Sequence, residues 1–225
     1  MRIILKPVGT VCVLLAFVSL VWLAIFKSGM GQPRKDQVAY ESPKNRDAVA
    51  LSTVPTDKIL NGGFEDNYLP VQPYSTVGKS SGVIAASWLD DSSWAPVTVE
   101  YSRDEQDPHG GKSCQKIAVM EVAQGKEARL QFVQELNLRI KTSYKASCWI
   151  RADRPTTVDF ALRQKMFPYR YYGVCKVSVG RTWQPISVSG TPTVAGSSWV
   201  MVKVSKPVTL WVDDATIAVA STPPG

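Results

Sequence analysis

The stretch 144–152 reads YKASCWIRA, and its side chains alternate between apolar and polar along its length. Successive side chains of a β-strand point to opposite faces of a sheet, so a half-buried strand shows this period of two. The face that we expect in the core carries Tyr144, Ala146, Cys148 and Ile150. The face that we expect to point outward carries Lys145, Ser147, Trp149 and Arg151. The stretch therefore predicts a β-strand that is buried on one side.

Similar short runs recur along the chain and are separated by turn residues such as Gly180, Gly190 and Pro207. The runs cover residues 97–101, 116–122, 144–150, 157–162, 174–179, 185–190, 199–204 and 208–220. No segment after residue 30 keeps a helical period over a window of about eleven residues. Short strands at this spacing predict an all-β sandwich, which we place at residues 58–221.

The first segment predicts a membrane anchor. Residues 8–26 carry no charge, and 19 residues at about 1.5 Å each nearly span a bilayer core of about 30 Å. No small-residue cleavage site follows, so we expect one uncleaved transmembrane helix within residues 1–27. Residues 28–57 are rich in Gly, Pro, Ser and mixed charge, which is typical of a flexible linker. We expect a single-pass protein of the cell membrane with its domain on the extracytoplasmic side; the alternative is secretion after cleavage of a signal peptide.

Composition and motifs argue against nucleic-acid binding and against catalysis. The formal net charge is +7 and the pI is about 9.2, but no block of Lys and Arg resembles a nucleic-acid-binding arm. His109 is the only histidine and lies in the turn-like stretch DPHGGKS, so we expect no Ser-His-Asp site. Glu100 and Asp104 are close in sequence but run into a turn, so we expect no glycosidase pair. We therefore predict that the chain is not an enzyme.

The cysteines leave the disulfide question open. Cys12 lies in the apolar segment, whereas Cys114, Cys148 and Cys175 lie in strand-like runs. Three cysteines allow at most one internal disulfide, and small buried thiols are the alternative. Because no C-x-x-C motif is present, we expect no zinc site.

Several stretches follow one another in a known order: ILNGGFED, SWLDDSSWAPVTVEY, HGGKSCQKIAV, VQELNL with SYKASCWIRAD, TWQPISVSG and LWVDDATI. In this order the chain resembles the carbohydrate-binding modules of the family 4/9 type, which are galactose-binding-like β-jelly rolls usually attached to polysaccharide hydrolases. The likeness covers about residues 58–220. It departs from the family at RIKTSY, where a Pro-Gly turn usually precedes the Tyr, and in the lack of a hydrolase within the 225 residues. The resemblance implies a jelly roll that binds carbohydrate without catalysis.

The resemblance also implies a structural calcium ion. Its ligands would be Glu65 of NGGFE, Asp213 as the first acid of the DD pair, and backbone oxygens near GKS, where Lys112 lies. The first and last strands of a jelly roll are neighbours, and two close carboxylates repel unless a cation or proton lies between them. Oxygen ligands suit Ca²⁺. The alternative is an exposed turn in which both carboxylates are solvated or paired with a lysine.

A loop rich in aromatic residues predicts a sugar-binding site. A pyranose stacks its apolar C–H face on an aromatic ring, and its hydroxyls need planar polar partners. The stretch 162–174, LRQKMFPYRYYGV, mixes such rings with basic residues in an expected hairpin connection. We select as candidate carbohydrate-binding residues Arg163, Phe167, Tyr169 and Tyr171. In the alternative, some of these rings close the end of the sandwich.

Further candidates come from the outward face of 144–152. A large aromatic side chain such as Trp149 is seldom exposed without a binding partner. We therefore place Trp149 and Arg151 on the concave face that usually forms the polysaccharide cleft in this fold. Gln134, on the preceding strand, is expected to hydrogen-bond a sugar hydroxyl there. In the alternative, this is the convex face and a loop covers Trp149. Trp88 and Trp94 are expected to be structural and to hold the first loop on the sandwich.

Together these features predict an exported, membrane-anchored jelly roll that binds a polysaccharide or oligosaccharide. A slight preference for acidic, uronate-bearing polysaccharides is expected from three arginines, Arg151, Arg163 and Arg170, because guanidinium pairs bidentately with carboxylate. The alternative is a structural or protein-interaction module of a cell-envelope complex on the same fold.

Overall fold

The computed structural model describes residues 56–124 and 127–220. In these residues no helix is long and apolar enough to cross a membrane. The expected anchor and nearly all of the expected linker lie outside the described residues, so both remain predictions. The described strands are β1 (Tyr68–Pro70), β2 (Lys79–Ala85), β3 (Leu89–Asp90), β4 (Val97–Asp104), β5 (Cys114–Val122), β6 (Leu130–Leu136), β7 (Tyr144–Ala152), β8 (Thr156–Gln164), β9 (Tyr171–Val179), β10 (Gln184–Gly190), β11 (Ser198–Val204) and β12 (Val208–Val219).

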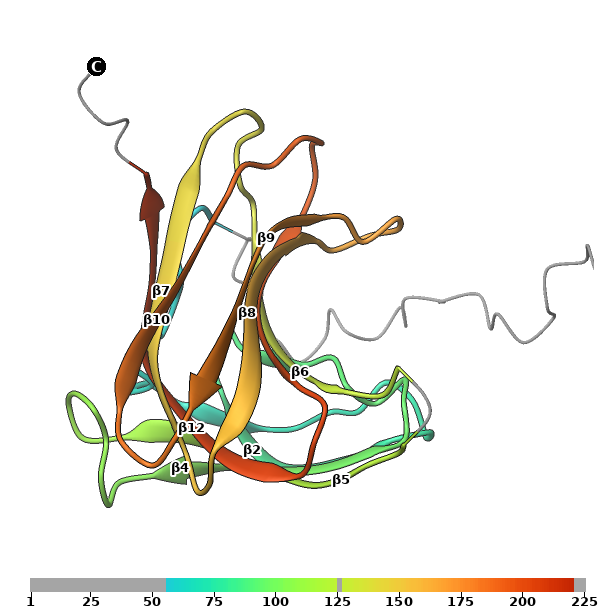
Figure 1. Cartoon of the computed structure of the whole chain (residues 1–225), viewed down its shortest axis with the longest axis vertical. Coiled ribbons are helices and arrows are strands. Elements are labelled where there is room, and N and C mark those ends of the chain that lie inside the picture. Colours follow the sequence, from blue (N-terminus) through green and yellow to red (C-terminus); the bar gives the residue numbers. More distant parts are fainter. Residues whose placement is uncertain (1–55, 125–126, 221–225) are drawn as a thin grey trace, which may run out of the picture. The chain divides into compact units, whose positions relative to one another are not determined.

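The strands form two sheets that pack face to face (Figure 1). The seven-stranded sheet has the order β1-β2-β4-β5-β12-β7-β10, and the five-stranded sheet has the order β3-β6-β11-β8-β9. The pairing of β2 with β4 is parallel, whereas the other recorded pairings are antiparallel. The all-β sandwich expected from the sequence is confirmed, and each expected run forms a strand. The expected runs do not include β1, β2 and β3, which are short or, in β2, mostly exposed, and β6 was expected only through the placement of Gln134 on a strand.

The core between the sheets is built from alternate residues of the strands. The four inward residues expected on β7 are each at most 1% exposed. Trp88 is also buried and stacks on Phe132 of β6, with ring centroids 4.6 Å apart and planes 8° apart. Its Nε1–H donates to the carbonyl of Asn61 at 3.2 Å, so Trp88 holds the segment before β1 on the sandwich. Trp94, in contrast, is not buried: it is 37% exposed, and the guanidinium of Arg129 lies over its ring.

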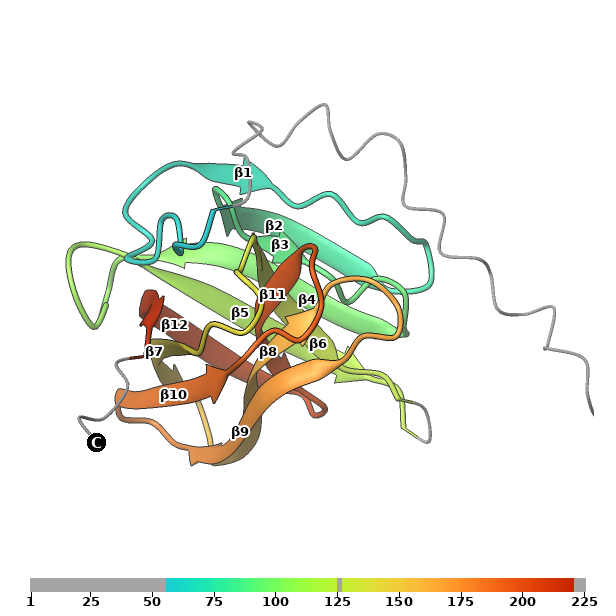
Figure 2. The same cartoon turned by 90° about the horizontal axis from the view of Figure 1, so that it is seen from above.

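Strand β9 is an edge strand of the five-stranded sheet and β10 is an edge strand of the seven-stranded sheet. The two strands lie side by side along one side of the sandwich (Figure 2). Their backbones approach so closely that a Cβ on Gly173 of β9 would overlap with the carbonyl oxygen of Ser189 of β10. A residue without a side chain is therefore required at this crossing. The contact lies next to the loop that joins β8 to β9.

The three cysteines of the described residues are free thiols. Cys114 and Cys148 are buried, and Cys175 is half-buried. Burial raises the pKa of the Cys114 thiol to about 12, and it raises the pKa of the Cys148 thiol further. The structure thus favours buried thiols over a disulfide.

Candidate functional site

The outer face of the five-stranded sheet carries an apolar cluster that is separate from the core between the sheets. It consists of Trp199 and Met201 of β11, Val133 of β6 and Ala161 of β8, with Leu89 packed against it. Met201 lies opposite Val133 on one neighbouring strand and opposite Ala161 on the other. Strand β11 reads SWVMVKV and is buried at every position, so it is apolar toward both faces. The strands of this sheet curve, with the outer face on their concave side (Figure 1).

Arg163 of β8 covers this apolar cluster. Its guanidinium carbon lies 4.9 Å from the ring centroid of Trp199, 5.0 Å from that of Tyr169 and 6.0 Å from that of Tyr171. The residue is only 5% exposed. Its ion-pair partner is Asp91, whose Oδ2 lies 4.0 Å from Nη2. The Nε of Arg163 has no hydrogen-bond partner among the described residues.

Two lysine–carboxylate ion pairs lie at the border of the same face. Lys165 Nζ lies 2.6 Å from Glu135 Oε2 across the end of the sheet near the β8–β9 loop. Lys203 Nζ lies 3.2 Å from Asp159 Oδ2 and 3.0 Å from the hydroxyl of Tyr171. Because Lys203 is 8% exposed, its pairing removes most of the cost of burying an ammonium group. The face therefore combines an apolar floor, a covering arginine and a rim of ion pairs.

The loop between β8 and β9 places aromatic rings at the edge of this face. Phe167 is 80% exposed, Tyr169 is 39% exposed and Tyr171, the first residue of β9, is 40% exposed. The rings of Phe167 and Tyr169 meet edge to face with centroids 6.1 Å apart. The backbone N–H of Gln164 donates to the carbonyl of Arg170 at 2.8 Å and closes the base of the loop. The structure thus brings together the four candidates of this stretch, and the exposure of the three rings does not fit rings buried at the end of the sandwich.

The placement expected for Gln134 is wrong. Gln134 of β6 points inward and is 2% exposed. Its Oε1 accepts the backbone N–H of Leu60 at 2.7 Å, and its Nε2 donates to the carbonyl of Leu60 at 2.8 Å. The side chain thus ties the segment before β1 to the sandwich and does not face a ligand.

Trp149 and Arg151 point outward as expected, but they lie on the other sheet. Both belong to β7 of the seven-stranded sheet, so they do not join the ring-bearing loop in one cleft. The ring of Trp149 stacks on His109, with centroids 3.7 Å apart. The guanidinium of Arg151 lies 4.1 Å from the ring centroid of Trp211 and 5.2 Å from that of Trp183. The alternative in which a loop covers Trp149 is therefore the observed one.

Several side chains on the outer face of the five-stranded sheet are not expected from the sequence. They are Leu89, Val133, Glu135, Asp159, Trp199, Met201 and Lys203. The signal available was the strand 199–204, in which Trp199, Met201 and Lys203 alternate with three valines. Two apolar faces on one strand indicate burial on both sides.

The loop between β4 and β5 is held by three carboxylates. Glu65 Oε1 accepts the backbone N–H groups of Lys112 and Ser113 at 2.8 and 3.0 Å, and these hydrogen bonds lower the pKa of Glu65. Asp213 Oδ2 accepts the N–H of His109 at 2.9 Å, and burial raises the pKa of Asp213 to about 6. Asp214 Oδ2 lies 2.6 Å from Nδ1 of His109. The expected metal ligands thus contact one short loop.

These residues suit a hard cation in donor type. Asp213 is fully buried, and its recorded hydrogen bonds all come from backbone N–H groups. A buried carboxylate without a cationic partner is costly. In the residues that the structure describes, no group of three or more His, Cys, Asp or Glu side chains is placed to hold a metal. Backbone oxygens would therefore have to supply the remaining ligands.

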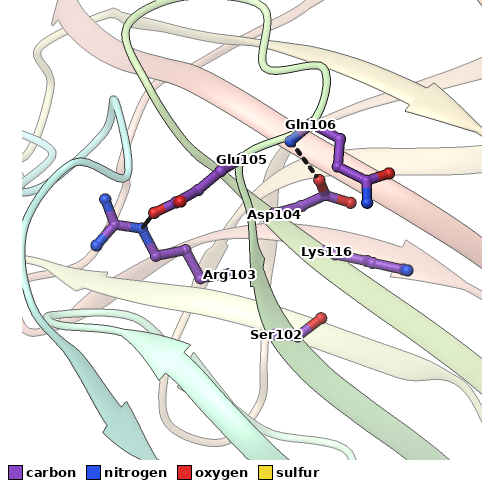
Figure 3. Close-up of a pocket in the computed structure, with 6 residues that line it drawn as sticks. All are labelled: Ser102, Arg103, Asp104, Glu105, Gln106 and Lys116. Carbon is purple, nitrogen blue, oxygen red and sulfur yellow. Dashed lines mark hydrogen bonds and ion pairs between the residues drawn. The ribbon is translucent and has the colours of Figure 1, made fainter.

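The outer surface near the β4–β5 loop also has a shallow, open pocket of about 490 Å³ (Figure 3). Its lining residues are Ser102, Arg103, Asp104, Glu105, Gln106 and Lys116. Arg103 Nε is paired with Glu105 Oε1 at 3.0 Å, and the N–H of Gln106 donates to Asp104 Oδ1 at 2.9 Å. Burial acts against ionisation of Asp104, but hydrogen bonds from Trp211 and Gln106 hold its pKa below the usual value. The lining has no aromatic ring, so we do not place the sugar site here.

Comparison with solved structures finds a similar fold in carbohydrate-binding modules. A family 4 carbohydrate-binding module superposes with a TM-score of 0.54 at 18% identity, over 72% of this chain and 99% of that one. The CBM22-1–CBM22-2 tandem domain of Paenibacillus barcinonensis Xyn10C superposes with a TM-score of 0.50 at 10% identity, over 71% of this chain and 47% of that one. No protein-family model and no curated protein sequence matches the chain. The described domain thus has the β-jelly-roll fold of such modules, as the sequence resemblance implies.

Proposed function

We propose that this chain is a non-catalytic carbohydrate-binding protein whose site is the outer face of the five-stranded sheet. The observation that carries the proposal is the cluster of rings around Arg163, with Phe167, Tyr169 and Tyr171 exposed at its edge. Exposed rings on a curved sheet offer stacking surfaces for the apolar faces of a sugar chain. Monomeric domains seldom expose neighbouring large rings without a binding role.

The polar groups of this face suit sugar hydroxyls. Glu135 and Asp159 offer planar carboxylates, and Gln131 Oε1 is a buried acceptor without a partner among the described residues. Such groups at the border of an apolar floor fix the orientation of a ligand, while stacking supplies most of the affinity. The ligand that this combination fits is a polysaccharide or oligosaccharide rather than a small apolar molecule.

The same carboxylates do not favour catalysis. Glu135 is paired with Lys165, and Asp159 is paired with Lys203. In both pairs a lysine ammonium group occupies the carboxylate, whereas a glycosidase needs two carboxyl groups that are free to flank the scissile bond. The ion pairs therefore support binding without hydrolysis.

We also propose that the domain is exported and is tethered to the cell membrane by the segment 8–26. Extracytoplasmic polysaccharide is the ligand that such a location makes available. A calcium ion held by Glu65, Asp213 and backbone oxygens near Lys112 would stabilise the β4–β5 loop. In this proposal the ion is structural, because its ligands surround a loop of the seven-stranded sheet and not the ring-bearing face.

Affinity electrophoresis of the full-length chain in mild non-ionic detergent tests the proposed function. Gels would contain xylan, β-glucan, galactan, pectin or alginate, and we expect at least one polymer to retard the protein. Tyr169→Ala should remove the retardation, since loss of one stacking ring costs about 1–3 kcal/mol. The matched control is Met120→Ala, because Met120 is 52% exposed on β5 of the other sheet. If no polymer retards the wild type, the proposal fails and the protein-interaction alternative replaces it.

A further inference from the structure

We propose that the ligand of this site bears carboxylate groups, so that the chain recognises a uronic-acid-containing polysaccharide through Arg163. This inference rests on the proposed carbohydrate binding and adds to it the chemical class of the sugar. It starts from two buried hydrogen-bond donors for which the described residues provide no acceptor.

Arg163 is a buried cation with incomplete compensation. Its side chain is 7% exposed, and its ion pair with Asp91 is long, at 4.0 Å. A guanidinium has five N–H donors, yet Nε has no partner among the described residues. The rings of Trp199, Tyr169 and Tyr171 supply cation–π attraction, which does not replace the missing hydrogen bonds. A charge that is buried in this way favours an arriving anion.

The second donor is the indole N–H of Trp199. Trp199 lies directly opposite Arg163 in the pairing of β11 with β8, and its Nε1 also lacks a partner among the described residues. Both unpartnered groups can only donate, so the group that would complete them is an acceptor. A carboxylate has two acceptor oxygens and a negative charge, and it forms short, strong bonds with guanidinium. A sugar hydroxyl would satisfy one donor but would leave the guanidinium charge with only its long ion pair to Asp91.

The other cations of this face do not compete for such an anion. Lys165 is paired with Glu135, and Lys203 is paired with Asp159. Arg170, in the loop beside the exposed rings, is exposed and has no ion pair within residues 56–124 and 127–220. Arg170 thus adds one positive charge where the rings are presented, beside Arg163 and its long ion pair with Asp91.

The approach to Arg163 passes the aromatic loop. Tyr169 is 39% exposed and its ring centroid lies 5.0 Å from the guanidinium carbon, so we expect the ring to move when a carboxylate binds Arg163. A partly exposed side chain on a surface loop makes such a movement at low cost. In the complex the Tyr169 ring would then stack on the sugar whose carboxylate meets Arg163.

Matched ligands test this inference on the wild-type protein alone. The full-length chain in detergent would be titrated with polygalacturonate and with alginate, and with the carboxyl-reduced form of each polymer, at about 0.15 M salt to screen non-specific attraction. We expect each acidic polymer to bind at least about tenfold more tightly than its reduced form, the effect of one charge-assisted hydrogen bond. Equal binding of the two forms overturns the uronate inference but leaves the proposed function intact. Failure of every neutral and acidic polymer to bind overturns both.

Variants then assign the preference to one residue. Arg163→Gln should reduce the preference to within about twofold, and Arg163→Lys should do the same because it keeps the charge but loses the planar fork. The control is Lys145→Gln, which removes one positive charge from an exposed position on β7. If Lys145→Gln abolishes the preference or folded Arg163→Lys keeps it, attraction is non-specific and the inference is wrong. Tighter binding of a sulfated, uronate-free galactan would also overturn it, in favour of sulfate esters.

Discussion

Replacing Gln134 with methionine should destabilise the domain and leave glycan binding unchanged. Gln134 is 2% exposed, and its amide makes two hydrogen bonds with Leu60, at 2.7 and 2.8 Å. Methionine has a similar length and is apolar, so Gln134→Met keeps the packing and removes both bonds. The N–H and C=O of Leu60 then lose their partners.

The magnitude follows from those two groups. Each buried unpaired backbone group costs about 1–3 kcal/mol, and Leu60 is half-buried, so we expect a total of about 2–4 kcal/mol. For a domain of this size about 1 kcal/mol shifts the melting temperature by about 2–4 °C, which gives a decrease of about 4–16 °C. Urea denaturation of the full-length chain should show a lower midpoint with an unchanged slope.

Gln131→Met is the matched control on the same strand for stability alone, because Gln131 belongs to the proposed binding face. Gln131 is also 2% exposed but points to the other face and donates one long bond, at 3.3 Å, to the carbonyl of Asp91. Its loss should cost less than about 1 kcal/mol. The reasoning is refuted if Gln134→Met unfolds like the wild type, or if it loses polysaccharide retardation while its stability is unchanged.

Three further predictions concern calcium, the thiols and the anchor. Calcium at millimolar concentration should raise the melting temperature by several degrees over that in EDTA, because a ligand at one hundred times its Kd stabilises the native state by about 2.7 kcal/mol. Glu65→Ala should remove the difference, and identical melting curves for the wild type with calcium and with EDTA would exclude the site. Reduction should leave the mass of the chain unchanged, and Cys114 and Cys148 should resist alkylation in the native state because their raised pKa values leave little thiolate at neutral pH; a mass gain of two hydrogen atoms on reduction would contradict this. Intact-mass measurement of the membrane fraction should find a chain that begins at or next to Met1, and a start beyond residue 25 would contradict the uncleaved anchor.

The fold was predictable because strand periodicity is a local property. On β7 the alternation in 144–152 predicts which side chains are buried, and the structure confirms Tyr144, Ala146, Cys148 and Ile150 as core residues. The same rule applied to β6 would have placed Gln134 inward, because it shares a face with Phe132 and Leu136. A polar residue is tolerated there because Leu60, 74 residues away in sequence, supplies both hydrogen-bond partners. That contact is not visible in the sequence.

The candidate site was predictable only in part. Arg163, Phe167, Tyr169 and Tyr171 lie within one short stretch, so chain connectivity alone brings them together. Trp149 is different, because periodicity shows that it points outward but not which sheet it belongs to. Sheet membership depends on the pairing of β7 with β10 and β12, which are distant in sequence.

The apolar cluster under the site, which includes Trp199 and Met201, could not be predicted from the sequence for a related reason. Strand β11 is apolar on both faces, and a continuous apolar run does not reveal that its two faces meet different partners. Trp199 and Met201 belong to the outer cluster, whereas Val200 and Val202 belong to the core between the sheets. Their separation follows from the position of β11 at the centre of the five-stranded sheet.

The central claim is that carbohydrate binds to the five-stranded sheet and not to the seven-stranded sheet. The most direct measurement compares the double variant Tyr169→Ala/Tyr171→Ala with Trp149→Ala, by affinity electrophoresis of the full-length chain in the polymer that retards the wild type. The double variant should lose retardation but stay folded, with only a small fall in melting temperature, because both rings are about 40% exposed and Tyr171 gives up one hydrogen bond with Lys203. Trp149→Ala should remain retarded but melt at a lower temperature, because it loses the stack on His109. Retardation that survives in the double variant and disappears in a folded Trp149→Ala would contradict the account.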